Sequence, residues 1–161
     1  MKISMIAAIG ENAEIGRNND LLWHLPDDFK WFIKHTKGKT VIMGRNTMNS
    51  LGKPLKNRVN VVLSSKNKDI IPGFEYYATL EEALRELQKE EEVMIIGGGK
   101  LYEYALPMSH RLYITHVDKS FSDADTFFPK ITKDWNVTYE EFHAVDESHQ
   151  LSFTFKVYER N

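Results

Sequence analysis

Short apolar runs rich in β-branched residues recur along the chain, and glycine, proline or polar residues bound each of them. This pattern is typical of β-strands. Several central runs, such as residues 41–43 and 94–96, are apolar at every position, which is typical of strands buried on both faces of a sheet. The predicted strands are Ile3–Ile9, Thr40–Met43, Val59–Leu63, Glu75–Tyr77, Val93–Ile96, Leu112–Val117, Asn136–Phe142 and Leu151–Tyr158.

Helical patterns separate many of these strands. Pro26 suits the first turn of a helix, and Thr79 with Glu82 three residues later forms the pattern of a capping box. Pro107 is expected to end the last helix. The four predicted helices begin near Leu25-Pro26, begin after Gly44-Arg45, span Leu80–Glu92 and span Lys100–Leu106.

The alternation of strands and helices predicts an α/β domain with a mainly parallel sheet. A short turn around Asp146–Ser148 links the last two strands, which predicts an antiparallel hairpin at one edge of the sheet. The chain shows no internal repeat, low-complexity tract or linker, so we expect a single domain over residues 1–161.

Composition narrows the class of protein. The chain has 161 residues, a net charge of −2 and no cysteine, which excludes disulfides, thiol catalysis and cysteine-ligated metal centres. The apolar run Ile3–Ile9 is too short to span a bilayer and lacks a signal-peptide cleavage site, so we expect no membrane association and a cytoplasmic location. The six histidines show no paired ligand spacing, and no metal site is expected.

Charge is unevenly distributed along the chain. Ten basic residues and no acidic residue lie between Lys30 and Lys68. These side chains are either separately solvated, or they form a face that meets a polyanionic ligand such as a phosphorylated cofactor, a polycarboxylate or nucleic acid.

Asp28 is the most informative residue of the first helix, because it falls inside an apolar stripe. One interpretation is a carboxylate that caps its own helix, where the helix dipole favours negative charge. The other is a carboxylate with a raised pKa in an apolar pocket, paired with a cationic or proton-exchanging ligand. Asp27 lies off the stripe, toward Lys30 and Lys34. The stripe consists of Leu25, Phe29, Phe32 and Ile33.

Three consecutive glycines, Gly97 to Gly99, follow a buried strand and precede a helix. Glycines at such a position let backbone amides approach a phosphate closely. The dinucleotide fingerprint G-x-G-x-x-G is not met, because Tyr102 stands at its third glycine, so a simple tight turn is an equal alternative. The tripeptide at 38–40 also fails as a P-loop, because Ile33 occupies the position of its first glycine.

Polar side chains follow three strands. Arg45, Ser65 and Lys100 each come just after a predicted strand, and the carboxyl ends of parallel strands meet at one edge of a sheet. A cluster of this kind suits a phosphate, such as the one that distinguishes NADP from NAD.

The order and spacing of several short motifs make the chain resemble bacterial dihydrofolate reductase over nearly its whole length. The motifs are Met5-Ile6-Ala7-Ala8, Ile15-Gly16, Trp23-His24-Leu25-Pro26-Asp27-Asp28, Val41-Ile42-Met43-Gly44-Arg45-Asn46-Thr47, Pro54-Leu55 with Arg58, Leu63-Ser64-Ser65, Ile95-Ile96-Gly97-Gly98-Gly99-Lys100-Leu101-Tyr102, Leu112-Tyr113-Ile114-Thr115-His116 and Asp125-Thr126-Phe127-Phe128-Pro129.

This resemblance implies an eight-stranded mixed sheet with four helices, and NADPH-dependent reduction of 7,8-dihydrofolate to tetrahydrofolate. Nothing in the sequence requires a dimer, so we expect a monomer. The resemblance also implies a cis peptide between Gly97 and Gly98. The implied catalytic residues are Asp28, Trp23 and Leu21, the last two in the segment 15–23 that matches a loop closing over the nicotinamide.

The resemblance also assigns binding residues. Asp28 is the sole acidic group at the pterin, and Arg58 takes the α-carboxylate of the substrate's glutamate tail. The substrate-binding residues are Ile6, Asp28, Phe32, Leu55, Arg58, Ile96 and Thr115. The cofactor-binding residues are Ala8, Ile15, Gly16, Arg45, Asn46, Thr47, Ser64, Ser65, Gly97, Gly98, Gly99, Lys100, Leu101 and Tyr102.

Three segments depart from the family's usual pattern: Leu22 replaces a proline, Lys56-Asn57 replaces Pro-Gly, and Ser122-Asp123-Ala124 replaces Glu-Gly. Two other functions are alternatives. One is a related reductase of another pterin or pyrimidine heterocycle, as in riboflavin biosynthesis. The other is a non-catalytic nucleotide or nucleic-acid binder, but the basic segment lacks interleaved aromatic residues, so no nucleic-acid partner is expected.

Overall fold

The computed structural model describes residues 1–16, 22–65 and 70–161. None of the helices in these ranges has the length and apolar character needed to cross a lipid bilayer. The elements in chain order are β1 (Lys2–Ile9), β2 (Glu14–Gly16), α1 (Pro26–Thr36), β3 (Thr40–Gly44), α2 (Arg45–Leu51), β4 (Val59–Leu63), β5 (Phe74–Tyr77), α3 (Leu80–Glu86), β6 (Glu92–Ile95), α4 (Gly99–Ala105), the 3₁₀ turn η1 (Leu106–Met108), β7 (Arg111–Val117), β8 (Thr126–Phe127), β9 (Trp135–His143) and β10 (Phe153–Arg160).

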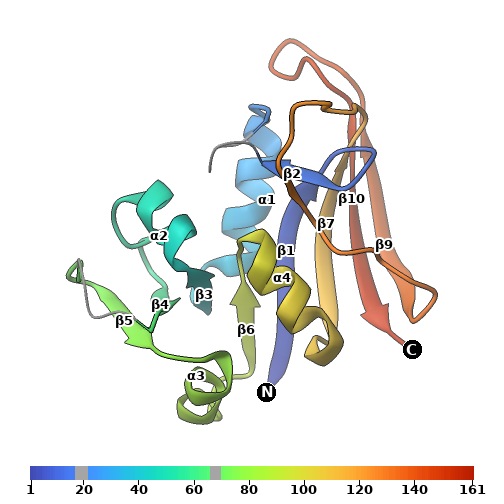
Figure 1. Ribbon diagram of the computed structural model, residues 1–161. Helices are drawn as coiled ribbons and strands as arrows, with labels where there is room; N and C mark the ends of the chain where they lie inside the picture. Colours follow the sequence, from blue (N-terminus) through green and yellow to red (C-terminus); the bar gives the residue numbers. More distant parts are fainter. Residues whose placement is uncertain (17–21, 66–69) are drawn as a thin grey trace.

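Eight strands form one twisted sheet in the order β5-β4-β3-β6-β1-β7-β10-β9 (Figure 1). The six strands from β5 to β7 run parallel to one another, whereas β10 pairs antiparallel with both β7 and β9. The predicted mixed sheet with an antiparallel hairpin at its edge is therefore confirmed. A sheet of this kind brings the carboxyl ends of its parallel strands to one edge, where α/β proteins bind ligands.

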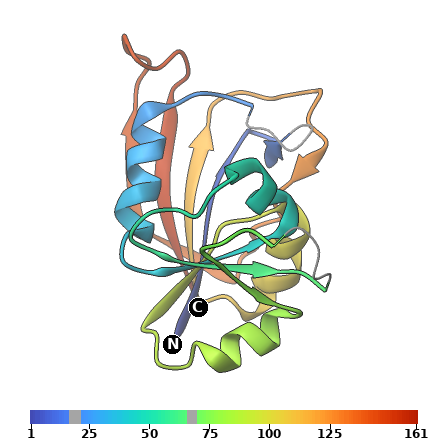
Figure 2. The ribbon, with the colours of Figure 1, turned by 90° about the vertical axis from the view of Figure 1, so that its left-hand side faces the viewer.

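Helices cover both faces of the sheet, which explains the continuously apolar strands (Figure 2). Ile42 and Ile95 face the core shared with α3 and α4. Their neighbours Val41, Met43 and Met94 face the opposite core, which is shared with α1 and α2. Successive side chains of a strand point to opposite faces, so a strand covered on both sides needs apolar residues at every position.

The third predicted helix is wrong in its extent, because α3 ends at Glu86 and Glu92 begins β6. Its start is confirmed, since the Thr79 hydroxyl accepts a hydrogen bond of 3.1 Å from the backbone N–H of Glu82. Beyond Leu87, the next positions on the buried face of a continued helix would be occupied by Glu90 and Glu91. Burying unpaired carboxylates is costly, so the helix stops.

Two connections also differ from the prediction. The short turn expected between the last two strands is a longer loop, residues 144–152, in which Asp146 and His149 form an isolated bridge. In addition, β2 and β8 form a second, two-stranded sheet that the sequence analysis missed. Both strands are too short to show a periodic pattern.

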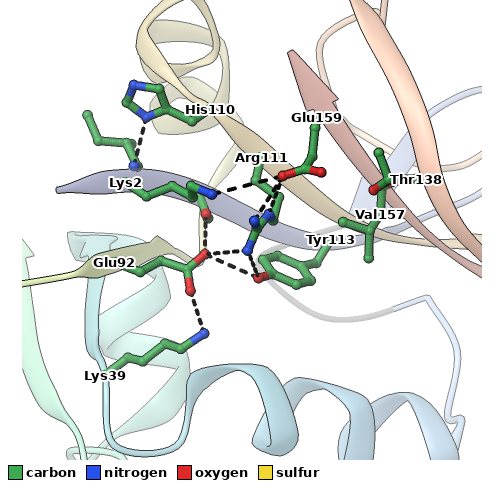
Figure 3. A network of polar contacts seen from close by, with 11 residues as sticks. Lys2, Lys39, Glu92, His110, Arg111, Tyr113, Thr138, Val157 and Glu159 are labelled. Atoms are coloured by element: carbon green, nitrogen blue, oxygen red, sulfur yellow. Dashed lines mark hydrogen bonds and ion pairs between the residues drawn. The ribbon is translucent and has the colours of Figure 1, made fainter. Parts of the chain in front are cut away.

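A polar network fills the edge of the sheet opposite the ligand edge, where the parallel strands begin (Figure 3). Glu92 receives hydrogen bonds from Lys39 Nζ at 2.6 Å, Ser4 Oγ at 2.5 Å and Tyr113 Oη at 3.1 Å. The Lys39 contact shows that the basic segment 30–68 does not form one continuous ligand face, because this lysine neutralises a carboxylate at the far edge.

Candidate active site

Asp28 is held between α1 and the sheet. It occupies the third position of α1, after Pro26, and its Oδ1 accepts a hydrogen bond of 2.5 Å from the hydroxyl of the fully buried Thr115 on β7. Burial raises the pKa of Asp28, and the bond from Thr115 partly opposes that shift. Both residues were expected at the pterin, and the structure brings them into contact.

The apolar stripe of α1 was only partly correct. Phe29 is 63% exposed, whereas Trp31 is 7% exposed and packs against Phe155 of β10 with ring centroids 4.3 Å apart. The large indole takes the central contact with the sheet, and this sets a rotation of the helix that leaves Phe29 outside. Asp28 still faces inward. The hydrogen bond from Thr115 shows this orientation, whereas the predicted stripe matches the buried face of α1 only in part.

Tyr102 of α4 holds the backbone of strand β1 in place. Its side chain is 5% exposed, and its hydroxyl donates a hydrogen bond of 2.7 Å to the carbonyl oxygen of Ile6 on β1. Burial and the nearby Asp28 raise the pKa of this phenol, so it stays neutral. Ile6, expected to line the pterin pocket, is thereby fixed through its backbone.

Arg58 and Leu55 lie on one loop that two polar residues hold in place. The buried Asn60 accepts a hydrogen bond of 2.9 Å from Leu55 N–H and donates to the carbonyl oxygens of Leu55 and Arg58. Arg58 Nη1 donates to Thr36 Oγ1, at the end of α1, over 3.2 Å. Neither Asn60 nor Thr36 was predicted from the sequence. A polar residue inside the apolar run of β4 was the available signal for Asn60.

The departure at Lys56-Asn57 does not disturb this loop. Asn57 has a φ of +61°, the left-handed region that a glycine would readily adopt. Asparagine is one of the few other residues that enters this region at low cost. The backbone turn needed before Arg58 is therefore retained.

The glycine run forms a close backbone junction between two strand ends. Gly44 N–H donates a hydrogen bond of 2.9 Å to the carbonyl oxygen of Gly97, and the Gly97–Gly98 peptide is cis, as the resemblance implied. Gly97 has a φ of +124°, and a Cβ there would lie 3.3 Å from the Tyr102 hydroxyl and 3.5 Å from Thr47 Oγ1. At Gly99 a Cβ would lie 2.7 Å from Thr126 Cγ2. Side chains here would fill a cradle that the glycines leave open.

The cationic residues expected at the phosphate lie near this cradle. Arg45 begins α2, and its Nη1 donates a hydrogen bond of 2.9 Å to Ser64 Oγ at the end of β4. Ser65 is exposed beside it, and Lys100 is exposed in the first turn of α4. The ends of the adjacent strands β3 and β4 thus bring Arg45 into contact with Ser64, the residue before Ser65 of the predicted cluster.

The remaining predicted cofactor residues occupy the same region. Ala8 is half-buried near the end of β1. Asn46 is exposed on α2, and Leu101 is half-buried on α4. Ile15 and Gly16 lie on β2, where the Gly16 carbonyl oxygen accepts a hydrogen bond of 3.0 Å from Asp125 N–H.

The segment matched to the closing loop is described only at its two ends. Leu21 lies outside the described residues. Trp23 lies at the far end, with its ring 5.3 Å from that of Phe121. Phe32 and Ile96, the other expected pocket residues, are half-buried and pack with Trp23 against the same core.

Glu14 is a buried carboxylate at the start of β2 that the sequence analysis missed. It is 1% exposed, and it accepts hydrogen bonds from the backbone N–H groups of Asn12 at 2.6 Å and Phe121 at 2.5 Å. Burial raises the pKa of Glu14, but these backbone donors outweigh it and hold the pKa below its ordinary value. Glu14 therefore ties the base of the loop segment to the segment around Phe121.

Comparison with known proteins places this geometry in a family. The model of the dihydrofolate reductase family matches residues 2–160. The dihydrofolate reductase of Haemophilus influenzae is 37% identical over 161 residues, covering 99% of each chain, and the type 3 enzyme of Salmonella typhimurium is 42% identical over 156 residues, covering 96% of each.

A solved structure agrees with the sequence relatives. The dihydrofolate reductase of Enterococcus faecalis, complexed with NADP(H) and RAB-propyl, superposes with a TM-score of 0.91 at 33% identity, covering 99% of this chain and 96% of the other. The chain therefore belongs to the dihydrofolate reductase family.

Proposed function

We propose that this chain reduces 7,8-dihydrofolate to 5,6,7,8-tetrahydrofolate with NADPH, using Asp28 as its acidic group at the pterin. The observation that carries the proposal is the hydrogen bond from the fully buried Thr115 to the half-buried Asp28 at the beginning of α1. A carboxylate with a raised pKa in such a place suits proton exchange with a bound heterocycle.

Asp28 would bind the 2-amino group and N3 of the pterin through its carboxylate. In its ionised form it favours a protonated N5, directly or through water, because negative charge beside the ring stabilises the cation. Ile6, Phe32 and Ile96 would form the apolar walls that orient the ring and exclude water.

Arg58 and Leu55 would bind the rest of the substrate. A guanidinium group pairs with a carboxylate through two parallel hydrogen bonds, so Arg58 suits the α-carboxylate of the glutamate tail. Asn60 and Thr36 support this role, since they fix the loop and the guanidinium in place.

The chain has residues that fit NADPH. The open cradle at Gly97 to Gly99 suits the pyrophosphate, with Thr47 beside it. Arg45, Ser64, Ser65 and Lys100 would hold the 2′-phosphate through charge-assisted hydrogen bonds. When bound, NADPH supplies the hydride that C6 of the pterin receives. Ala8, Ile15, Gly16, Asn46, Leu101 and Tyr102 would complete the cofactor site, and Trp23 and Leu21 would shield the reacting rings.

We further propose that residues 1–161 act as one domain and a monomer in the cytoplasm. The residues proposed to bind the substrate and the cofactor, Asp28, Arg58 and Arg45, all come from this chain, which supports the proposal. Light scattering of the purified protein checks the monomer, and a dimer that dissociates with loss of activity would contradict it.

A substrate comparison tests the activity. Purified protein is incubated with NADPH and either dihydrofolate or a ribosylated aminopyrimidine of the riboflavin type, and loss of NADPH absorbance is followed. We expect oxidation with dihydrofolate only. Oxidation with the aminopyrimidine alone would support the alternative reductase, and binding of NADPH without oxidation by either substrate would support a non-catalytic nucleotide binder.

A further inference from the structure

Helix α1 has no capping side chain of its own. Its N-cap residue is Leu25, which makes no side-chain hydrogen bond to the first turn. The N–H groups of Asp28 and Phe29 donate to the carbonyl oxygen of Leu25, at 3.0 and 3.2 Å. The N–H of Asp27 instead donates to Nε2 of His149, over 3.1 Å. The cap of α1 is thus supplied by a residue far along the chain.

His149 is rigidly held in the loop between β9 and β10, which lies beside the beginning of α1 (Figure 2). The side chain is 2% exposed, and its ring lies 5.2 Å from that of Phe153. Its Nδ1 lies 2.8 Å from Asp146 Oδ1, and Ser148 N–H also donates to that oxygen, over 2.9 Å. Two backbone hydrogen bonds between Asp146 and His149 close the turn.

These contacts determine which ring nitrogen carries the proton. A backbone N–H is only a donor, so Nε2 must accept from Asp27 through its lone pair. The proton of the neutral ring then lies on Nδ1, where it is donated to the Asp146 carboxylate. Asp27, Asp146 and His149 place potential ligand atoms within 4.8 Å of one another. Because both ring nitrogens of His149 are engaged, we assign this cluster to capping and not to metal binding.

We propose that His149 is a positioning residue for the reaction: it caps α1 and thereby fixes Asp28 relative to Thr115 and the pterin. Asp27, which receives the cap, directly precedes Asp28 in the first helical turn. A first turn without its cap frays readily, and fraying here moves the carboxylate away from Thr115. The inference rests on the role proposed for Asp28.

Three variants separate capping from general stabilisation. His149→Leu removes the acceptor, whereas His149→Gln can place an amide oxygen near the position of Nε2. His143→Leu is the matched control. Its ring also packs against Phe153, with centroids 4.9 Å apart. Its Nδ1 lies 4.0 Å from the Asp27 carboxylate and its Nε2 contacts Glu141, so this variant removes a histidine beside Asp27 without removing the acceptor of the Asp27 N–H.

The first measurement is NMR of the full-length protein. Ring ¹⁵N shifts of wild type should show His149 protonated on Nδ1 at neutral pH. Amide exchange of Asp27 should speed up on the order of five- to tenfold in His149→Leu, and should stay near wild type in His149→Gln and His143→Leu. A ring protonated on Nε2, or unchanged exchange of Asp27 in His149→Leu, would overturn the inference.

The second measurement is kinetic. In His149→Leu we expect a higher KM for dihydrofolate and a shifted pH profile of hydride transfer, with the NADPH dissociation constant unchanged and with recovery in His149→Gln. A wild-type pH profile and KM in His149→Leu would refute the positioning role. If His149→Leu does not fold, the inference is still tested by the tautomer of His149 in wild type and by the amide exchange and kinetics of His149→Gln. Normal activity of Asp28→Asn would instead refute the role of Asp28, which the NMR measurement does not depend on.

Discussion

Thr115 donates a hydrogen bond of 2.5 Å to Asp28, and so links the middle of β7 to the first turn of α1. The two residues are separated by 87 positions in the sequence. Because the threonine is fully buried in the sheet, the carboxylate is held by a strand of the core. The same bond restrains the pKa of Asp28, which burial raises.

Replacing Thr115 with valine keeps the shape and removes the donor. The pKa of Asp28 should then move further upward, measured by NMR titration of the carboxyl carbon. Since a hydrogen bond to a charged group contributes on the order of 1.5–3 kcal/mol, kcat/KM for dihydrofolate should fall about tenfold or more. A downward shift of the pKa would contradict the geometry, and Thr115→Ser is the control that retains the donor.

Arg45→Gln should change cofactor preference. Its guanidinium is placed for the 2′-phosphate, so the KM for NADPH should rise by about tenfold to a hundredfold, while the KM for NADH should change little. Steady-state rates with both cofactors provide the measurement. Equal kcat/KM of the wild-type enzyme for NADPH and NADH would show that no residue recognises the 2′-phosphate.

Arg58→Leu should affect binding and not chemistry. Removing a bidentate partner of the glutamate carboxylate should raise the KM for dihydrofolate strongly, with little effect on a dihydropterin that lacks the tail. Lys56→Leu is the control, because only the backbone carbonyl of Lys56 contacts Arg58. If both substrates lose activity equally in Arg58→Leu, the arginine is structural.

Glu92→Gln should reduce stability without reducing kcat, because the network of Figure 3 lies where β6 begins, at the opposite end of this strand from the glycine run. Burial raises the pKa of Glu92, but Lys39 and Ser4 outweigh it and hold the pKa below its ordinary value. A depressed pKa stabilises the fold above the ordinary carboxyl pKa, and this contribution is lost as pH falls through the folded-state value.

Thermal unfolding of wild type and Glu92→Gln over a series of pH values tests this. The difference in Tm between wild type and Glu92→Gln should be largest at neutral pH and should shrink as the solution becomes strongly acidic. A difference that grows on acidification would contradict the sign of the pKa shift.

The sequence predicted the parts of the fold that depend on local pattern. Apolar runs such as Val41-Ile42-Met43 indicate strands buried on both faces, and the alternation of strands with helices indicates a mainly parallel sheet. The strand-end residues Arg45 and Ser64 then meet because the topology leaves them adjacent.

Residues that depend on distant contacts were not predictable in this way. Glu14 and Phe121 are 107 residues apart, and His149 and Asp27 are 122 apart, so no periodicity in the sequence joins them. The exposure of Phe29 depends on how Trp31 packs on β10, because that contact sets the rotation of α1. Spacing along a helix shows which residues share a face, but only tertiary packing decides which face is buried.

The central claim is that Asp28 is the carboxylate of the reaction, and the most direct test compares two adjacent substitutions. Asp28→Asn and Asp27→Asn each remove one charge from the first turn of α1, and Asp27→Asn keeps the N–H that His149 caps. Hydride transfer is measured across pH by rapid mixing of the NADPH complex with dihydrofolate. We expect Asp28→Asn to lose about 10²–10⁴-fold near neutral pH, with partial recovery in acid, where solvent protonates the substrate directly, and Asp27→Asn to stay close to wild type. Near-normal hydride transfer by Asp28→Asn at neutral pH, or a comparable loss in Asp27→Asn, would contradict the claim.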